Sequence, residues 1–250
     1  MLAGSAGQIL LLISMLEEDA LPNAHGVIER MAEHLMRSRV DVDGPGWRLT
    51  PNEIPVCGFA HGRAGVALAL LQAGRLLDRR DLRDAAIEVF EAEHRLRGDQ
   101  PSEGWPDYRG VRDSDPRPGP GGSPFWCNGL EGIALSRAAA LQIEDHPVLR
   151  DDLEFCLAGL REAPLSHRHH LCCGISGRIE TDVTLQRLCK TPALIDDESR
   201  RRVLARSLDP TAVKEHGLTG MALFQGMSGP VWSALGQISD RQSDILLLRI

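Results

Sequence analysis

Two short segments of this 250-residue chain place cysteine beside a Gly-x-x-Gly step. Cys127 lies two residues before the step that starts at Gly129, and the pair Cys172–Cys173 directly precedes the step that starts at Gly174. The thiols occupy equivalent positions relative to a repeated Gly-x-x-Gly step. They are therefore expected to converge on one metal, although 45 residues separate Cys127 from Cys172. Zinc is the favoured metal, since three thiolates suit it and leave a fourth coordination position open.

An open position on a tri-thiolate zinc favours a particular kind of chemistry. A substrate thiol that coordinates there loses its proton at neutral pH. Three protein thiolates leave the site with a net negative charge, so a fourth thiolate remains electron-rich and nucleophilic. This chemistry is thiol alkylation or conjugate addition rather than activation of water. Taken alone, the adjacent cysteine pair would also be consistent with buried thiols or a vicinal disulfide.

The Gly-x-x-Gly step recurs along the chain and organises it. Its second glycines are Gly7, Gly65, Gly132, Gly177 and Gly229. Each precedes an apolar run of helical length, at residues 8–16, 66–77, 133–141, 178–188 and 230–238. Residues 81–96 and 147–163 instead carry apolar side chains on one face, which is typical of amphipathic helices. Buried helices that alternate with amphipathic ones predict an all-α fold, an α/α solenoid or closed toroid.

The repeat register also singles out a histidine. His61 occupies the same repeat position as Asn128, Cys173 and Gln225. We therefore expect it to face the centre as a general acid or base, in preference to a helix-capping or core histidine.

Several other polar residues have two open interpretations. Three histidines before the cysteine pair could ligate a metal, but their polar loop favours a solvated cluster: His167, His169 and His170. Arg63 and Glu131 could line a central cavity or pair at its rim. Among the remaining cysteines, Cys156 is expected in the core, whereas Cys57 and Cys189 have no assigned partner.

Two segments interrupt the helical pattern. Residues 98–126 are dense in proline and glycine, which excludes a helix. They form either an unstructured connection or a loop that faces the substrate. Residues 41–55 hold Trp47 and are expected to carry some strand, whose place the pattern does not define.

The composition narrows the class of protein. The hydrophobic share of 42% is ordinary for a globular protein, and the formal charge is 28 − 35 = −7. The sequence has no cluster of Lys and Arg of the kind that binds a phosphate backbone, so nucleic acid is not an expected partner. Because no apolar run reaches the length of a membrane span, we expect no membrane span and a cytosolic location. In that reducing compartment the six cysteines are expected as thiols or metal ligands rather than disulfides.

Four motifs in order resemble the lanthionine synthetase C-like cyclases, and in particular the C-terminal cyclase module of class II lanthipeptide synthetases. They are Gly58-Phe59-Ala60-His61-Gly62, Trp126-Cys127-Asn128-Gly129, Leu171-Cys172-Cys173-Gly174 and Phe224-Gln225-Gly226-Met227-Ser228-Gly229. The resemblance covers nearly the whole chain and implies an α/α toroid, typically of seven repeats around a central zinc. It also implies intramolecular addition of peptide cysteine thiols to dehydroalanine or dehydrobutyrine, which forms lanthionine or methyllanthionine thioether rings.

By motif position, the resemblance implies that Cys127, Cys172 and Cys173 are the zinc ligands and that His61 handles the proton at the enolate. Most members carry Cys-His-Gly where this chain has Cys172-Cys173-Gly174, so it is similar to the three-cysteine subgroup. That subgroup is associated with a more reactive zinc and a broad tolerance of substrates.

The chain also departs from the family pattern. Five repeats are visible, near residues 4–40, 57–97, 126–163, 171–208 and 224–250 of one cyclase domain spanning 1–250. The ring is therefore expected to be incomplete, with about two repeats missing before Met1. An acidic residue of the family has no counterpart here, and Ser123 stands where some relatives carry arginine.

We accordingly expect a zinc-dependent lanthipeptide cyclase that acts on a dehydrated precursor peptide, with a dehydratase domain or protein as a partner. One alternative is a non-catalytic, zinc-stabilised helical scaffold that binds a peptide. Another is a related toroid enzyme that adds a free small thiol to dehydrated residues. Replacing Cys173 or His61 with alanine separates an enzyme from a scaffold.

Overall fold

The computed structural model describes residues 4–18, 21, 23–209, 220–238 and 244–248. Over these residues the chain is all-α, as its sequence predicts, apart from one short hairpin. The helices are α1 (Ser5–Glu17), α2 (His25–Ser38), α3 (Arg63–Leu76), α4 (Arg80–His94), α5 (Leu130–Leu141), α6 (Pro147–Glu162), α7 (Ile175–Cys189), α8 (Asp197–Ser207) and α9 (Ser228–Ile238). The 3₁₀ helix η1 spans Ile245–Leu247. Strands β1 (Val40–Asp41) and β2 (Pro45–Gly46) pair antiparallel.

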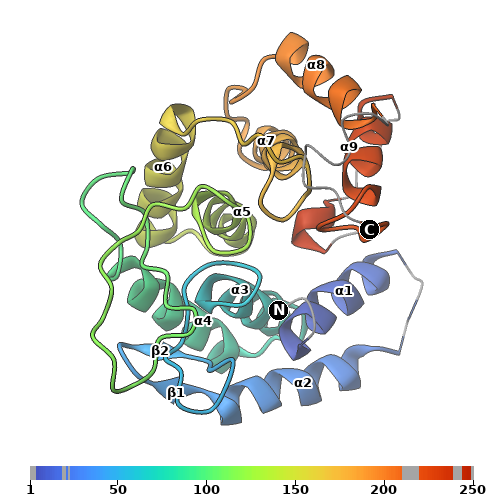
Figure 1. The fold of residues 1–250 in the computed structure, drawn as a ribbon. Helices are drawn as coiled ribbons and strands as arrows, with labels where there is room; N and C mark the ends of the chain where they lie inside the picture. Colours follow the sequence, from blue (N-terminus) through green and yellow to red (C-terminus); the bar gives the residue numbers. More distant parts are fainter. Residues whose placement is uncertain (1–3, 19–20, 22, 210–219, 239–243, 249–250) are drawn as a thin grey trace.

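The helices form an inner and an outer layer, the arrangement of an α/α toroid. Figure 1 shows α3, α5 and α7 nearly end-on in the middle, with α4, α6 and α8 outside them. The inner helix α5 is buried continuously from Leu130 to Ala140, because apolar and small residues occupy every side. The outer helix α4 buries Leu82 and Phe90 but exposes Asp81 and Arg80, in keeping with its amphipathic pattern.

The repeated glycines determine how the inner helices begin. α1, α3, α5 and α7 start directly after Gly4, Gly62, Gly129 and Gly174, which are extended and give no side-chain cap. At Gly129 an added Cβ would lie 2.0 Å from the carbonyl oxygen of Ser123, so only glycine fits beneath the folded-back loop. The loop before α5 is therefore folded tightly over the start of that helix.

Buried ion pairs tie the two layers together. Arg137 of α5 donates to Glu93 of α4 at 2.8 Å and to Asp152 of α6 at 2.9 Å, and all three side chains are fully buried. Glu131 of α5 accepts from Arg178 of α7, also at 2.8 Å. A charge on an inner helix is thus neutralised by a neighbouring helix, as burial of an ion requires.

The two breaks in the helical pattern are both structured. The strand expected between residues 41 and 55 lies at 40–46, where Arg63 holds the hairpin by donating to the carbonyl oxygens of Pro45 (3.0 Å) and Pro55 (2.6 Å). In the segment 98–126, the indole of Trp105 donates to the carbonyl oxygen of Glu93 at 2.8 Å. The interpretation of this segment as an unstructured connection is therefore wrong.

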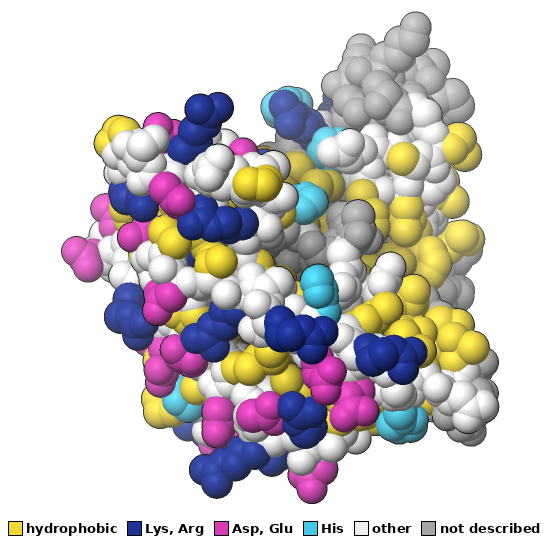
Figure 2. Space-filling model, turned by 90° about the horizontal axis from the view of Figure 1, so that it is seen from below, with side chains coloured by type: hydrophobic (Ala, Val, Ile, Leu, Met, Phe, Trp, Pro, Cys, Tyr) yellow, Lys and Arg dark blue, Asp and Glu magenta, His cyan; other side chains and the backbone are white. Residues whose placement is uncertain are grey.

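The surface is mixed in charge. Figure 2 shows the face that carries α2 and the hairpin, where Lys/Arg and Asp/Glu side chains are interspersed. Histidine side chains lie around a hollow at the upper edge of that view. Within the described part of the chain, no helix is long and apolar enough to cross a membrane.

Candidate metal centre

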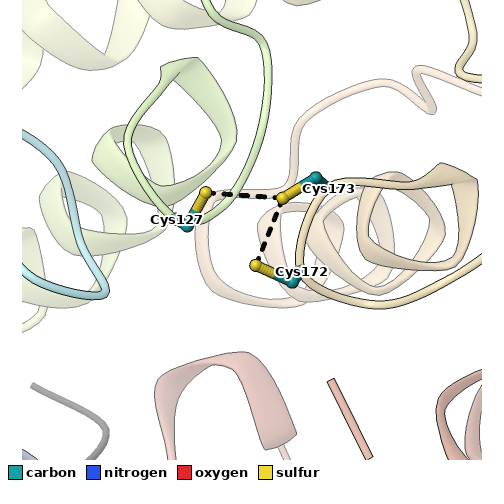
Figure 3. Close-up of side chains that lie close together, drawn as sticks. All are labelled: Cys127, Cys172 and Cys173. Carbon is teal, nitrogen blue, oxygen red and sulfur yellow. Dashed lines mark hydrogen bonds between the residues drawn. The ribbon is translucent and has the colours of Figure 1, made fainter. Parts of the chain in front are cut away.

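The structure brings the three predicted thiols together. Cys127 lies in the loop before α5, and Cys172 and Cys173 lie in the loop before α7. Figure 3 shows their side chains pointing toward one another across the gap between these loops. The Sγ atoms of Cys127 and Cys173 are 3.6 Å apart, those of Cys172 and Cys173 are 3.2 Å apart, and all three lie within 4.8 Å of one another.

This geometry fits a zinc ion. With Zn–S bonds of about 2.3 Å, a tetrahedral site places its sulfur atoms about 3.8 Å apart, close to the separations found here. All six cysteines are free thiols, so Cys172 and Cys173 do not form the vicinal disulfide that their adjacency allowed. Three soft sulfur ligands and no competing cross-link make this trio a suitable donor set for zinc.

The electrostatics of the trio also favour a cation. Contacts with the thiols of Cys127 and Cys172 hold the pKa of Cys173 well below its usual range, at about 3. The pKa of Cys172 is raised by its contacts with Cys127 and Cys173 and by burial. The pKa of Cys127 is raised too, because contact with Cys173 and burial outweigh the lowering effect of Cys172. The trio thus holds one thiolate beside two thiols. This is expected of three acidic groups in contact, because the first negative charge opposes ionisation of its neighbours unless a cation is present.

Main-chain hydrogen bonds set the loops in register. The N–H of Ala60 donates to the carbonyl oxygen of Cys127, and the N–H of Cys172 donates to that of Phe224, both at 2.9 Å. Ala60, Cys127, Cys172 and Phe224 occupy the same position of the repeat. Equivalent backbone atoms therefore link one repeat to the next, which explains why thiols distant in sequence converge.

One glycine permits the close approach of these loops. Gly58 has a φ of +93°, and a Cβ added there would lie 2.4 Å from the Cα atom of Asn128. A side chain would thus be strained by its backbone conformation and would collide with the loop that carries Cys127.

His61 lies beside this site. Its neighbour Ala60 carries the hydrogen bond to Cys127, and the imidazole lines a cavity of about 370 Å³ together with His34, Trp47 and residues at the start of α1. Partial burial lowers the pKa of His61, and the positive charge of Arg109 lowers it further, while Cys127 raises it. The imidazole is therefore mainly neutral at pH 7 and able to accept a proton.

Two of the three neighbouring histidines differ from the prediction. His167 is exposed, but His169 and His170 are 5% and 7% exposed, so the expectation of a solvated cluster is wrong for this pair. His170 accepts a hydrogen bond at Nδ1 from the N–H of Cys173 at 3.2 Å, and Nδ1 of His169 is hydrogen-bonded to Ser207 of α8. His170 is thus bonded within its own loop, whereas the partner of His169 is distant in sequence.

The other cysteines are separate from the trio. Cys57 and Cys156 are buried, and burial raises the pKa of Cys57 to about 12 and that of Cys156 well above its usual value. Both are therefore protonated, and the expected core position of Cys156 is confirmed. Cys189 is half-buried at the last residue of α7, the opposite end of the helix from Cys173.

The polar residues inside the Gly-x-x-Gly steps serve the scaffold. Arg63 holds the hairpin, and Glu131 is 2% exposed beside Arg178, so neither lines an open cavity. Burial raises the pKa of Glu131 to about 7, although Arg178 opposes this shift.

A second group could by composition hold a metal, at His94, Asp151 and Asp152. Here Arg97 donates to Asp152 at 3.1 Å and Arg137 donates to it at 2.9 Å. These guanidinium groups already neutralise the carboxylates, so the group is an ion-pair network and not a metal site.

Two grooves are lined by residues near the site in the sequence: His61 lines one, and Phe125 and Arg168 line the other. One is the cavity at His61. The other, of about 670 Å³, lies between the long loop and the segment after α6, and is lined by Phe125, Leu165 and Arg168 among others. Sequence reasoning did not identify Arg109 or Arg168, whose charges lower the pKa of Cys173. Arginines on irregular loops carry no periodic signal that would place them beside a site.

A family model described as lanthionine synthetase C-like protein matches residues 1–248. A search of curated proteins finds no match.

Proposed function

Because the chain belongs to the lanthionine synthetase C-like family, we propose that it is a zinc-dependent lanthipeptide cyclase of the three-cysteine subgroup. It forms thioether rings by adding cysteine thiols of a peptide to dehydroalanine or dehydrobutyrine in the same peptide. The observation that carries this proposal is the trio of Sγ atoms, within 4.8 Å of one another, on loops from two repeats.

Cys127, Cys172 and Cys173 would hold the metal. When bound, zinc supplies a Lewis acid that lowers the pKa of a substrate thiol to near neutrality. Because the protein offers three thiolates and zinc favours four ligands, the donor set leaves room for one thiol of the substrate.

His61 manages the proton. Its neutral imidazole accepts the proton of the substrate thiol, and the thiolate sulfur then forms a bond to Cβ of the dehydroamino acid. The electron pair of the Cα–Cβ double bond moves toward the carbonyl group, which becomes an enolate. The imidazolium of His61 returns the proton to Cα, so the reaction consumes no other reagent.

The substrate is a peptide rather than a small molecule. Two grooves of about 370 and 670 Å³ support this proposal, one lined by His61 and the other by Phe125 and Arg168, because largely apolar linings with a few charged groups suit the side chains of a peptide. The dehydroamino acids must be made beforehand by a dehydratase domain or protein.

The proposal is tested with a dehydrated peptide that carries one cysteine and one dehydroalanine. Ring formation does not change the mass, so free thiol is measured by alkylation and mass spectrometry over time. We expect zinc-loaded protein to remove the free thiol faster than buffer alone, and Cys173→Ala to lose this effect while Cys189→Ala retains it.

Other outcomes assign the chain to a different function. Peptide binding without loss of thiol would favour the zinc-stabilised scaffold. Addition of a free small thiol to a cysteine-free dehydrated peptide, without ring formation, would favour the third possibility. No zinc in folded protein would overturn the catalytic proposal.

A further inference from the structure

The loop that carries His61 is buried except at the histidine itself. Every residue from 54 to 63 is buried apart from residue 61, which is exposed and lines the cavity of about 370 Å³. The loop closes on itself, because the N–H of Arg63 donates to the carbonyl oxygen of Val56 at 3.0 Å. Such a loop presents one polar side chain from a fixed base.

A carboxylate from the outer layer of helices reaches this loop. Glu93 lies in the last turn of α4 and is 0% exposed. Its Oε1 accepts a hydrogen bond from the N–H of Gly58 at 2.8 Å, and its Oε2 accepts one from Nη2 of Arg137, also at 2.8 Å. One oxygen is thus engaged by the His61 loop and the other by the inner helix α5.

The position of Glu93 is itself well defined. Its carbonyl oxygen accepts from the indole of Trp105, and its partner Arg137 donates to Asp152 from both Nε and Nη2, at 3.0 and 2.9 Å. The acceptor that meets Gly58 is therefore fixed on every side by buried hydrogen bonds. Such bonds are strong because one partner is charged and water is excluded.

Two backbone bonds carry this order to His61. The N–H of Gly58 is held by Glu93, and two residues later the N–H of Ala60 donates to the carbonyl oxygen of Cys127 at 2.9 Å. His61 follows directly. Among the described residues no hydrogen bond reaches the imidazole itself, so the backbone that carries it determines where it stands.

We propose that Glu93 is a positioning residue for the reaction, and that it acts through the Gly58 N–H to hold His61 where its imidazole meets the peptide. This inference rests on the proposed cyclase function. Glu93 is fully buried and exchanges no proton with the substrate. A carboxylate suits the place because both of its oxygens accept, whereas an amide would set an NH₂ group against either Gly58 or Arg137.

The effect on rate follows from the demands of proton transfer. A general acid or base works only within hydrogen-bond reach of the atom it serves. A displacement of about 1 Å, even from a change remote from the chemistry, can slow a reaction by about 10²-fold. Loss of the bond to Gly58 should therefore slow ring formation without removing zinc.

The test compares Glu93→Gln with Asp152→Asn, which likewise replaces a buried carboxylate by an amide of the same size. Asp152 is the matched control because it faces the same Arg137, while its own hydrogen bonds among the described residues go to His94, Arg97 and Arg137. Ring formation is measured at saturating peptide, with bound zinc and stability determined on the same samples. Exchange of the Gly58 amide hydrogen is followed by magnetic resonance on protein labelled with ¹⁵N-glycine.

We expect Glu93→Gln to slow ring formation by about 10–10²-fold, to keep zinc and to speed exchange at Gly58. Asp152→Asn should lose comparable stability but keep a rate and a Gly58 exchange close to those of the natural protein. In a His61→Ala background Glu93→Gln should have no further effect, because no imidazole remains to be positioned.

A second variant covers the case in which Glu93→Gln does not fold. Glu93→Asp keeps a negative charge beside Arg137, but its carboxylate is one methylene shorter and cannot reach both partners, so the same loss of rate is expected. A loss that Asp152→Asn shares, or one that persists in full in the His61→Ala background, would show a merely structural role and overturn the inference.

Failure of the proposed function gives a different result. Natural protein that closes no ring would overturn the cyclase function, and exchange at Gly58 would still decide whether Glu93 holds the His61 loop. Exchange that Glu93→Gln and Glu93→Asp leave unchanged would overturn the positioning role whatever the activity. Natural protein that closes rings no faster than the Glu93 variants would overturn the inference alone.

Discussion

The main-chain N–H of Ala60 donates to the carbonyl oxygen of Cys127 across a distance of 2.9 Å. This one bond couples the residue before His61 to the first candidate zinc ligand. The loop that carries His61 is thereby fixed in position relative to the loop that carries Cys127, although the two belong to different repeats. The side chain of His61 takes no part in the bond, so its chemistry and the metal site can be separated by mutation.

We predict that His61→Ala retains zinc but slows ring formation by about 10²–10⁴-fold, the usual contribution of a general acid–base group. The measurement is the rate of loss of free thiol from a dehydrated peptide, with zinc content determined on the same samples. His34→Ala, at another histidine of the same cavity, is the matched control and should be nearly as active as the natural protein. Loss of zinc from His61→Ala would show that this residue supports the metal instead.

The metal itself gives the second prediction. Purified protein should contain about one zinc ion per chain, because three thiolates converge, and replacing any one of Cys127, Cys172 or Cys173 with alanine should abolish stoichiometric binding. Cys189→Ala is the control, since this thiol lies at the far end of α7. Plasma mass spectrometry measures the zinc content.

Removal of zinc should also lower stability. A ligand that binds only the folded state stabilises it by about 3 kcal/mol when its free concentration is 100-fold above its Kd. A chelator should therefore lower the Tm of the natural protein and leave that of Cys173→Ala unchanged. Equal Tm changes in both proteins would argue against a folded-state metal site.

The features that the sequence predicted well are those carried by repetition. The Gly-x-x-Gly steps and the apolar runs after them predicted α1, α3, α5, α7 and α9 to within a few residues. The equivalence of Cys127 and Cys172–Cys173 in the repeat predicted their convergence, because equivalent loops meet at one face. Periodicity was informative here because each repeat must bury its apolar helix against the neighbouring repeats.

Features that depend on partners distant in sequence were missed. His169 looks solvated within its polar loop, yet Ser207 of α8 covers it. The hairpin at 40–46 exists because Arg63 binds carbonyl oxygens there, and neither residue type nor local spacing reveals such a contact.

A fourth prediction concerns the buried charges between the layers. Asp152→Asn removes one of the two buried carboxylates that face the fully buried Arg137, so only Glu93 remains to neutralise the guanidinium group. We expect a loss of about 1.5–3 kcal/mol in the free energy of unfolding, the usual contribution of a hydrogen bond to a charged group, because Glu93 still pairs with Arg137. Denaturant titration measures it.

The matched control is the neighbouring carboxylate. Asp151 is 57% exposed and contacts Arg97 at 2.9 Å, so Asp151→Asn should cost less than about 1 kcal/mol. Similar losses in both variants would mean that burial of the pair with Arg137 contributes nothing particular to stability.

The last prediction concerns the pH dependence of stability through Glu131. Burial raises its pKa from 4.5 to about 7 in the folded protein, even though Arg178 opposes the shift, and its Oε2 has no hydrogen-bond partner among the described residues. Because the folded state holds the proton more tightly than the unfolded chain, this group's contribution is fully present below pH 4.5. It is lost as the pH rises through 7, by up to about 3 kcal/mol.

Glu131→Gln cannot ionise and should lack this loss. Both proteins carry the same thiols, so effects of zinc on the rest of the fold cancel in the difference between their free energies of unfolding at each pH. We expect the natural protein to lose stability relative to Glu131→Gln between pH 5 and pH 7.5, measured by denaturant titration at constant ionic strength. Parallel curves over that interval would show that Arg178 keeps Glu131 ionised throughout, and the raised pKa would then be wrong.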